Sequence, residues 1–261
     1  MKKPDKAVIL AGGYGTRISE ESYDKPKPMV LIDNKPILWH ILKYYSFYGV
    51  KKFIICCGYK SYVIKNFFLN YNYSNSDIEI DLKKNKIKNL NSVSEDWNVK
   101  LIETGSETMT GGRLKRIKKY LNNNENFYMT YGDGLSDINL NNLFTFHKKN
   151  KTLATVSAFA PPGRWGNLEI ENNKVSKFTE KPKNSNNFIN CGFFILNKKV
   201  LEFIDSDETF FEREPLQKLS EIKQLSAYKH KGFFAPMDTL KDKKNLQQMI
   251  IDNKAPWMLW R

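Results

Sequence analysis

Short uninterrupted apolar runs alternate along the chain with segments of helical periodicity. The runs at 6–11 and 52–57 are closed by glycine or polar residues, as expected of parallel strands buried on both faces. Between them, apolar residues recur every three or four positions over 36–49, which predicts a helix with one buried face. Proline suits the first turn of this helix, and we expect Asp33 and Asn34 to cap it.

The same alternation continues towards the C-terminus. Further strands are predicted at 99–104, 127–131, 153–160 and 188–196, with a hairpin at 167–181. Further helices are predicted at 62–71, 111–121, 140–149 and after Asp238. The pattern favours an α/β fold with a single doubly wound, mostly parallel mixed sheet flanked by helices. We expect one domain over 1–261, with a peripheral insertion at 72–98 carrying a strand or hairpin near 77–82, and a C-terminal helical extension at 239–261.

Cysteine usage and hydropathy narrow the class of protein. The three cysteines, Cys56, Cys57 and Cys191, lack the spacing of a disulfide framework or a zinc site, so we interpret them as small apolar residues within strands. No apolar run reaches the roughly 18 residues that a membrane span requires. The N-terminal apolar stretch is too short for a secretory signal. We therefore expect a cytoplasmic protein with no membrane partner.

The net charge raises the question of nucleic acid. The chain has 42 basic and 28 acidic residues, a formal charge of +14. The basic residues are spread along the chain, without an arginine-rich arm or a recognised nucleic-acid motif, so we predict no nucleic-acid partner. A positive field also favours small polyanions such as nucleotides and sugar phosphates. Binding of nucleic acid is kept as an alternative to be tested.

A glycine-rich segment, "LAGGYGTR" at 10–17, directly follows the first predicted strand. Glycines in such a turn let backbone N–H groups approach a phosphate closely. The segment is neither a Walker A loop nor the dinucleotide fingerprint, because it lacks G-K-[ST] and the third glycine. Thr16 adds a hydroxyl donor, Arg17 two parallel donors and Lys27 a point charge. Together these residues predict a phosphate site, although tight turns without ligands use the same residue types.

Two aspartates follow predicted apolar strands, Asp133 in "YGDG" and Asp238 in "PMDT". Ligands of open α/β sheets bind beyond the carboxyl ends of strands, so both carboxylates could face one crevice. Two carboxylates together with nucleotide phosphates suit Mg²⁺. An isolated aspartate after a strand is more often a turn or a cap. In "EKP" and "INCG", Glu180 and Asn190 could hold sugar hydroxyls, and Lys181 could neutralise a second phosphate.

The combination of these motifs resembles the sugar-nucleotide pyrophosphorylase, or nucleotidyltransferase, family over nearly the whole chain from Lys6. "LAGGYGTR" with "KPKPM" matches the superfamily signature. "TGSETMTGGRLKR", "PPGRWGNLEI", "INCGFF", "EREPL" and "PMDTLKDK" are most similar to the members that act on CTP and glucose 1-phosphate. The resemblance implies a Rossmann-like fold and transfer of CMP from CTP to α-D-glucose 1-phosphate, giving CDP-glucose and pyrophosphate with Mg²⁺ as cofactor. It also implies a homo-oligomer, with a hexamer as one candidate, and a role in deoxysugar and O-antigen polysaccharide synthesis.

The resemblance also implies roles for individual residues. Lys27, Arg17 and Asp133 would be catalytic, and Asp133 and Asp238 would bind the metal. The sugar phosphate would contact Tyr131, Glu180, Lys181 and Asn190. The nucleotide would contact Leu10, Ala11, Gly12, Gly13, Tyr14, Gly15, Thr16, Arg17, Lys27, Thr108, Gly111, Arg113 and Gly132.

Three positions depart from the family pattern. Cys191 stands where glycine is usual, Phe211 where tryptophan is common, and Trp165 where phenylalanine is common. Cys191 is adjacent to Asn190, so its effect would fall on the choice of sugar. The alternatives are the same reaction with UTP or dTTP or with another sugar 1-phosphate, and a nucleotide-sensing module without catalysis.

Overall fold

The centre of the fold is a seven-stranded sheet of order β14-β10-β13-β8-β1-β4-β7. The computed structural model describes residues 1–91, 94–161, 167–171, 174–179 and 188–261. In this sheet only β13 is antiparallel to its neighbours, β8 and β10. This arrangement confirms the predicted α/β class with a mostly parallel mixed sheet. The strands of the sheet are β1 (Lys6–Leu10), β4 (Lys52–Cys57), β7 (Asn98–Glu103), β8 (Asn126–Tyr131), β10 (Ala154–Phe159), β13 (Ile189–Asn197) and β14 (Leu225–His230).

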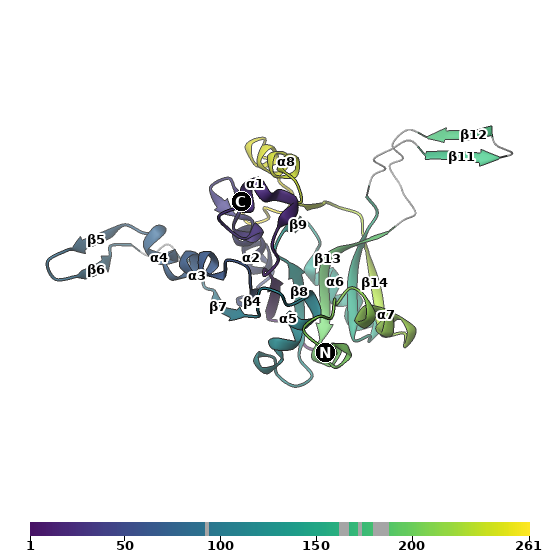
Figure 1. Cartoon of the computed structure of the whole chain (residues 1–261), viewed down its shortest axis with the longest axis horizontal. Coiled ribbons are helices and arrows are strands. Elements are labelled where there is room, and N and C mark those ends of the chain that lie inside the picture. The colour runs from purple at the N-terminus through teal and green to yellow at the C-terminus, as the bar shows by residue number, and fades with distance from the viewer. Residues whose placement is uncertain (92–93, 162–166, 172–173, 180–187) are drawn as a thin grey trace.

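Helices flank the sheet, and each face carries its own apolar cluster (Figure 1). Alternate residues of β1 belong to different clusters, Ala7 and Ile9 to one and Val8 and Leu10 to the other. This division explains why the first strand is apolar throughout, because both of its faces are buried. The helices are α1 (Ser19–Ser22), α2 (Ile37–Phe47), α3 (Ser61–Leu69), α4 (Tyr71–Ser74), α5 (Thr110–Arg116), α6 (Leu140–Asn150), α7 (Glu214–Glu221) and α8 (Leu240–Ile251).

The start of α2 differs from the prediction. Asp33 and Asn34 have φ values of 51° and 61° and form the tight turn between the short strands β2 (Leu31–Ile32) and β3 (Lys35–Pro36). Both short polar residues tolerate the left-handed conformation that this turn requires. Pro36 stands at the N-cap position, and no side chain caps the helix. The predicted cap was therefore wrong, and the two residues shape a hairpin instead.

Two hairpins project from the body of the protein (Figure 1). The first pairs β5 (Ile78–Asp81) with β6 (Lys86–Asn89), within the predicted insertion. The second pairs β11 (Asn167–Glu171) with β12 (Lys174–Thr179), at the position predicted from the sequence. The predicted helix over 111–121 is shorter than expected, because α5 ends at Arg116 and a 3₁₀ turn follows.

The cysteine prediction is confirmed. Cys56 and Cys57 lie in β4 and Cys191 lies in β13, and all three are free thiols in the buried interior. Among the described residues, no helix is both long and apolar enough to cross a membrane.

The C-terminal segment packs into the main core. Helix α8 begins with a capping box, in which Thr239 accepts from the Asp242 N–H and Asp242 accepts from the Thr239 N–H. Beyond this helix, Trp257 is fully buried and stacks on Phe233 at a ring separation of 5.5 Å.

We expect Trp257→Ala to lower the free energy of unfolding by about 3–5 kcal/mol, because it leaves a large cavity in the core. Ile251→Ala is the matched control, since Ile251 is 63% exposed, and should change stability by less than about 0.5 kcal/mol. Urea unfolding measures both. A loss of stability in Trp257→Ala as small as that in Ile251→Ala would show that the C-terminal segment does not stabilise the core.

Candidate active site

A cavity of about 600 Å³ opens beyond the carboxyl ends of β1 and β8. Its wall is formed by the glycine-rich segment, the start of α5, the end of β8, the start of β13 and the segment around β15 (Phe234–Pro236). Residues predicted from distant motifs are thus gathered in one place. The predicted residues that line the cavity are Leu10, Ala11, Gly12, Gly13, Gly15, Thr16, Lys27, Thr108, Arg113, Tyr131, Gly132, Asp133, Asn190 and Asp238.

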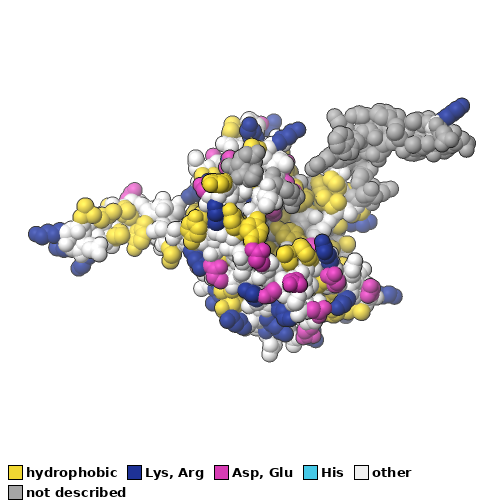
Figure 2. Space-filling model, in the orientation of Figure 1, with side chains coloured by type: hydrophobic (Ala, Val, Ile, Leu, Met, Phe, Trp, Pro, Cys, Tyr) yellow, Lys and Arg dark blue, Asp and Glu magenta, His cyan; other side chains and the backbone are white. Residues whose placement is uncertain are grey.

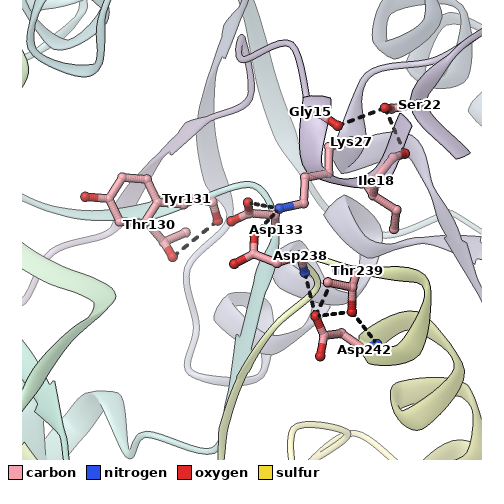
Figure 3. Close-up of polar contacts among 10 residues, drawn as sticks. All are labelled: Gly15, Ile18, Ser22, Lys27, Thr130, Tyr131, Asp133, Asp238, Thr239 and Asp242. Atoms are coloured by element: carbon pink, nitrogen blue, oxygen red, sulfur yellow. Dashed lines mark hydrogen bonds and ion pairs between the residues drawn. The ribbon is translucent and has the colours of Figure 1, made fainter. Parts of the chain in front are cut away.

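Lys27 joins the two aspartates at this cavity (Figure 3). Its Nζ lies 2.7 Å from Asp133 Oδ2 and 2.6 Å from Asp238 Oδ1. The Lys27 side chain is 8% exposed, whereas those of Asp133 and Asp238 are 30% and 27% exposed. The ammonium group therefore bridges two carboxylates that solvent still reaches, and the three side chains together keep one negative charge that a cationic ligand could offset.

A short strand pair brings the two aspartates together. Strand β9 (Gly134–Ser136) pairs antiparallel with β15, and the Met237 N–H donates to the Asp133 carbonyl at 2.8 Å. Asp133 directly precedes β9, and Asp238 follows β15 by two residues. The Asp238 N–H donates to the Asp242 carboxylate at 3.1 Å, which ties this aspartate to the start of α8. The backbone thus fixes both carboxylates.

Close approach of side chains explains two glycines of the glycine-rich segment. Gly15 has a φ of +68°, and a Cβ there would lie 3.0 Å from Lys27 Cβ. A Cβ on Gly12 would lie 2.0 Å from the guanidinium of Arg113. The Gly12 carbonyl accepts from Arg113 Nη2 at 2.9 Å. Glycine is therefore needed so that the loop can lie against Arg113 and Lys27.

Arg113 has a structural task besides its predicted contact with the nucleotide. It is buried, and its Nη1 donates to Thr104 Oγ1 at 2.8 Å and to the Gly105 carbonyl at 2.6 Å. Together with the bond to Gly12, these contacts tie the glycine-rich segment to the loop at Thr104 and Gly105. Burial lowers the pKa of Arg113.

We expect Arg113→Lys to raise the KM for the nucleotide about tenfold, because one ammonium cannot serve carbonyls that a planar guanidinium spans. Arg116→Lys is the control on the same helix, since Arg116 is exposed and its ion pair with Asp207 would survive. Initial rates against nucleotide concentration decide the matter. An unchanged KM in Arg113→Lys would contradict a role for Arg113 in holding the loop.

Some predicted residues lie elsewhere or cannot be placed. Tyr14 is 43% exposed, and its hydroxyl donates to Glu107. Gly111 packs against the Thr209 carbonyl, which its N–H meets at 2.9 Å, and it does not line the cavity. Glycine is needed at this position, since a Cβ there would lie 2.6 Å from that carbonyl. The described residues do not include Trp165, Glu180 or Lys181, and they include Arg17 without its side chain.

One residue of the cavity was not among the predicted site residues. Glu212 accepts hydrogen bonds from the hydroxyls of Tyr131 and Thr110, each at 2.5 Å. It lies just before α7, an element that the periodicity did not predict. Only its place within the quoted segment "EREPL" could have drawn attention to it.

The chemistry of the cavity does not favour a cysteine nucleophile. Cys191 lines the cavity, and burial raises the pKa of its thiol to about 12. Its Sγ lies 3.2 Å from the Ser157 carbonyl. The thiol is therefore protonated at neutral pH.

Within the described part of the chain, no three His, Cys, Asp or Glu side chains cluster as a metal site.

Comparison with known proteins agrees with the fold. The profile of the family described as nucleotidyl transferase matches residues 6–239. The chain therefore belongs to the nucleotidyl transferase family. The glucose-1-phosphate cytidylyltransferase of Salmonella typhi is 51% identical over 255 residues, 98% of this chain and 99% of that protein. The probable glucose-1-phosphate cytidylyltransferase of Bacillus subtilis is 40% identical over 256 residues, 98% of this chain and 100% of that protein.

A solved structure extends the likeness to three dimensions. The crystal structure of HddC from Yersinia pseudotuberculosis superposes with a TM-score of 0.67 at 26% identity, covering 94% of this chain and 99% of that chain. The resemblance predicted from the motifs is thereby confirmed.

Proposed function

We propose that the protein transfers CMP from CTP to α-D-glucose 1-phosphate and releases CDP-glucose and pyrophosphate. The observation that carries this proposal is the convergence of Lys27, Asp133 and Asp238 beside the glycine-rich segment in one cavity. The likeness to two glucose-1-phosphate cytidylyltransferases, at 51% and 40% identity, supports the choice of substrates.

The reaction requires alignment of two polyanions and no covalent enzyme intermediate. An oxygen of the sugar phosphate forms a bond to the α-phosphorus of CTP, while the bond from that phosphorus to the bridging oxygen breaks and pyrophosphate leaves. The protein's task is to hold the partners in line and to neutralise their charge. We assign Lys27 to the α-phosphate, Arg17 to the leaving pyrophosphate and Lys181 to the attacking phosphate. The backbone N–H groups of the glycine-rich segment would hold the triphosphate.

The donor set of the cavity fits a magnesium ion. Asp133 and Asp238 supply two carboxylates, each about a third exposed, at 30% and 27%. Mg²⁺ is commonly held by one or two carboxylates together with phosphate oxygens and water. We therefore assign these two residues as its ligands. When bound, the ion supplies charge neutralisation and polarises phosphate oxygens.

An oligomer is also part of the proposal. Apolar side chains on the hairpin β5–β6 and just beyond its strands are more than half exposed, and apolar atoms are visible along this arm in Figure 2. Such a patch is typical of a protein contact. Together with the family resemblance, it supports a homo-oligomer. We also propose that the enzyme works in the cytoplasm and supplies deoxysugar and O-antigen synthesis. The exposed residues are Ile80, Leu82, Ile87 and Leu90.

A pyrophosphate-release assay tests the proposed reaction. It crosses CTP, UTP, dTTP and GTP with the 1-phosphates of glucose, mannose and galactose. We expect CTP with glucose 1-phosphate to exceed every other pair by at least about tenfold in kcat/KM. A preference for UTP, dTTP or another sugar would overturn the substrate assignment. CTP binding without pyrophosphate release would indicate a nucleotide sensor, and DNA binding that CTP does not compete would indicate a nucleic-acid protein.

A further inference from the structure

We propose that Glu212 is a specificity residue that accepts hydrogen bonds from hydroxyls of the sugar. With Tyr131, it makes one end of the cavity selective for hydrogen-bond donors. This inference rests on the proposed function and extends it to a residue without an assigned role.

Three cavity residues, from β8, α5 and the turn before α7, form a connected set, and a fourth lies beside them in β13. Tyr131 is the last residue of β8, and its hydroxyl donates to Glu212 Oε1 at 2.5 Å. Thr110, the first residue of α5, donates to Glu212 Oε2 at 2.5 Å. Asn190, in β13, is the second predicted sugar residue at this end of the cavity. All four residues line the cavity. Glu212 therefore connects the start of α5 with Tyr131, one of the predicted sugar residues.

The backbone holds the Tyr131 ring in place. Gly192 has a φ of +79°, and a Cβ there would lie 2.6 Å from Tyr131 Cδ2. The ring also meets Phe194 edge-on, with centroids 6.4 Å apart and an interplanar angle of 85°. The Gly192 N–H donates to Asn190 Oδ1 at 2.7 Å, which fixes the side chain of the neighbouring asparagine. The tyrosine hydroxyl therefore has a fixed position and a fixed partner.

The direction of these hydrogen bonds determines which groups of a ligand can bind to Glu212. The Tyr131 hydroxyl and the Thr110 hydroxyl both donate hydrogen bonds to the Glu212 carboxylate. Thr110 Oγ1 in turn accepts from the Phe211 N–H at 2.9 Å. A carboxylate has about four acceptor positions, so Glu212 keeps some for a ligand.

The acceptor character of Glu212 distinguishes the sugar hydroxyls of the substrate from its phosphate. A phosphate group offers negative acceptor oxygens, which a carboxylate repels. Sugar hydroxyls can donate, so they satisfy the remaining acceptor positions of Glu212. Figure 3 shows the Tyr131 ring directed away from the cluster of Lys27, Asp133 and Asp238. The cavity thus has one end at Lys27, Asp133 and Asp238, where the phosphates and Mg²⁺ would bind, and a separate acceptor end at Glu212 for the sugar ring.

The test uses Glu212→Gln with glucose 1-phosphate and its 2-, 3-, 4- and 6-deoxy analogues. A site built around a substrate hydroxyl rejects the analogue that lacks it, so the wild type should lose at least about tenfold in kcat/KM with one or more analogues. Glu212→Gln should lose about tenfold in kcat/KM with glucose 1-phosphate. Its kcat/KM should fall no further with those same analogues. The KM for CTP should stay within about twofold, which a general disturbance of the cavity would not allow.

Two further variants keep the test decisive. Glu208→Gln, on the same segment and exposed, should behave as the wild type in every assay. Tyr131→Phe should lose discrimination against the same analogues, and it decides the question if Glu212→Gln does not fold. An unchanged pattern of analogue rejection, or a rise in the KM for CTP equal to that for the sugar, would overturn the inference. A wild type that makes no CDP-glucose would instead refute the proposed function.

Discussion

Lys27→Met is expected to lower kcat by at least about a hundredfold, because removal of one preorganised charge at a reacting group commonly costs about 2–4 kcal/mol. Lys27 is 8% exposed, and its Nζ is within 2.7 Å of both aspartates. Methionine keeps much of the side-chain length and volume but cannot neutralise charge. The loss should therefore appear in kcat and in kcat/KM, measured as initial rates of pyrophosphate release with CTP and glucose 1-phosphate.

Lys25→Met provides the matched control. Lys25 lies two positions before Lys27 in "KPKPM" and pairs only at 3.5 Å with Asp24, whose side chain is 72% exposed. Its replacement should change kcat by less than about threefold, as an exposed ion pair contributes little. Circular dichroism establishes that both variants are folded. Near-normal turnover of folded Lys27→Met would remove this residue from the active site.

Asp133→Asn and Asp238→Asn are each expected to lower kcat by at least about a hundredfold, because each removes a proposed magnesium ligand and an ion-pair partner of Lys27. Residues that act as one unit have non-additive effects. The double variant should therefore be no more than about tenfold slower than the worse single variant. Binding of Mn²⁺ without nucleotide, followed by electron paramagnetic resonance, should weaken in all three variants.

Asp24→Asn is the control, since its side chain is 72% exposed and belongs to a surface pair. Its turnover and Mn²⁺ affinity should match those of the wild type. Fully multiplicative losses in the double variant, or Mn²⁺ binding unaffected by either single substitution, would contradict a shared site.

Local pattern predicted most of the central sheet, because the strands that are buried on both faces have the most distinctive sequences. The runs in β1 and β4 are examples, with Ala7, Val8, Ile9 and Cys56 all fully buried. The prediction failed at Asp33 and Asn34, since the same residues favour helix caps and left-handed turns. Tertiary pairing of β2 with β3 selects the turn.

The candidate site was predictable where motifs are local and not where tertiary structure assembles it. Lys27, Asp133 and Asp238 each stood in a recognisable segment, but their contact depends on the three-residue strands β9 and β15, which are too short to show periodicity. Glu212 stood in the segment "EREPL", but nothing local indicated its role, because its partners Tyr131 and Thr110 come from distant elements. The long-range pairing that completes this site leaves no trace in local sequence.

The most direct test of the account is a crystal structure of the protein with CTP and Mn²⁺, with the ion located by its anomalous signal. We predict one nucleotide in the cavity, with its phosphates against residues 10–17 and Lys27, and an ion bound by both Asp133 and Asp238. A triphosphate bound outside this cavity, or an ion that contacts neither aspartate, would contradict the account.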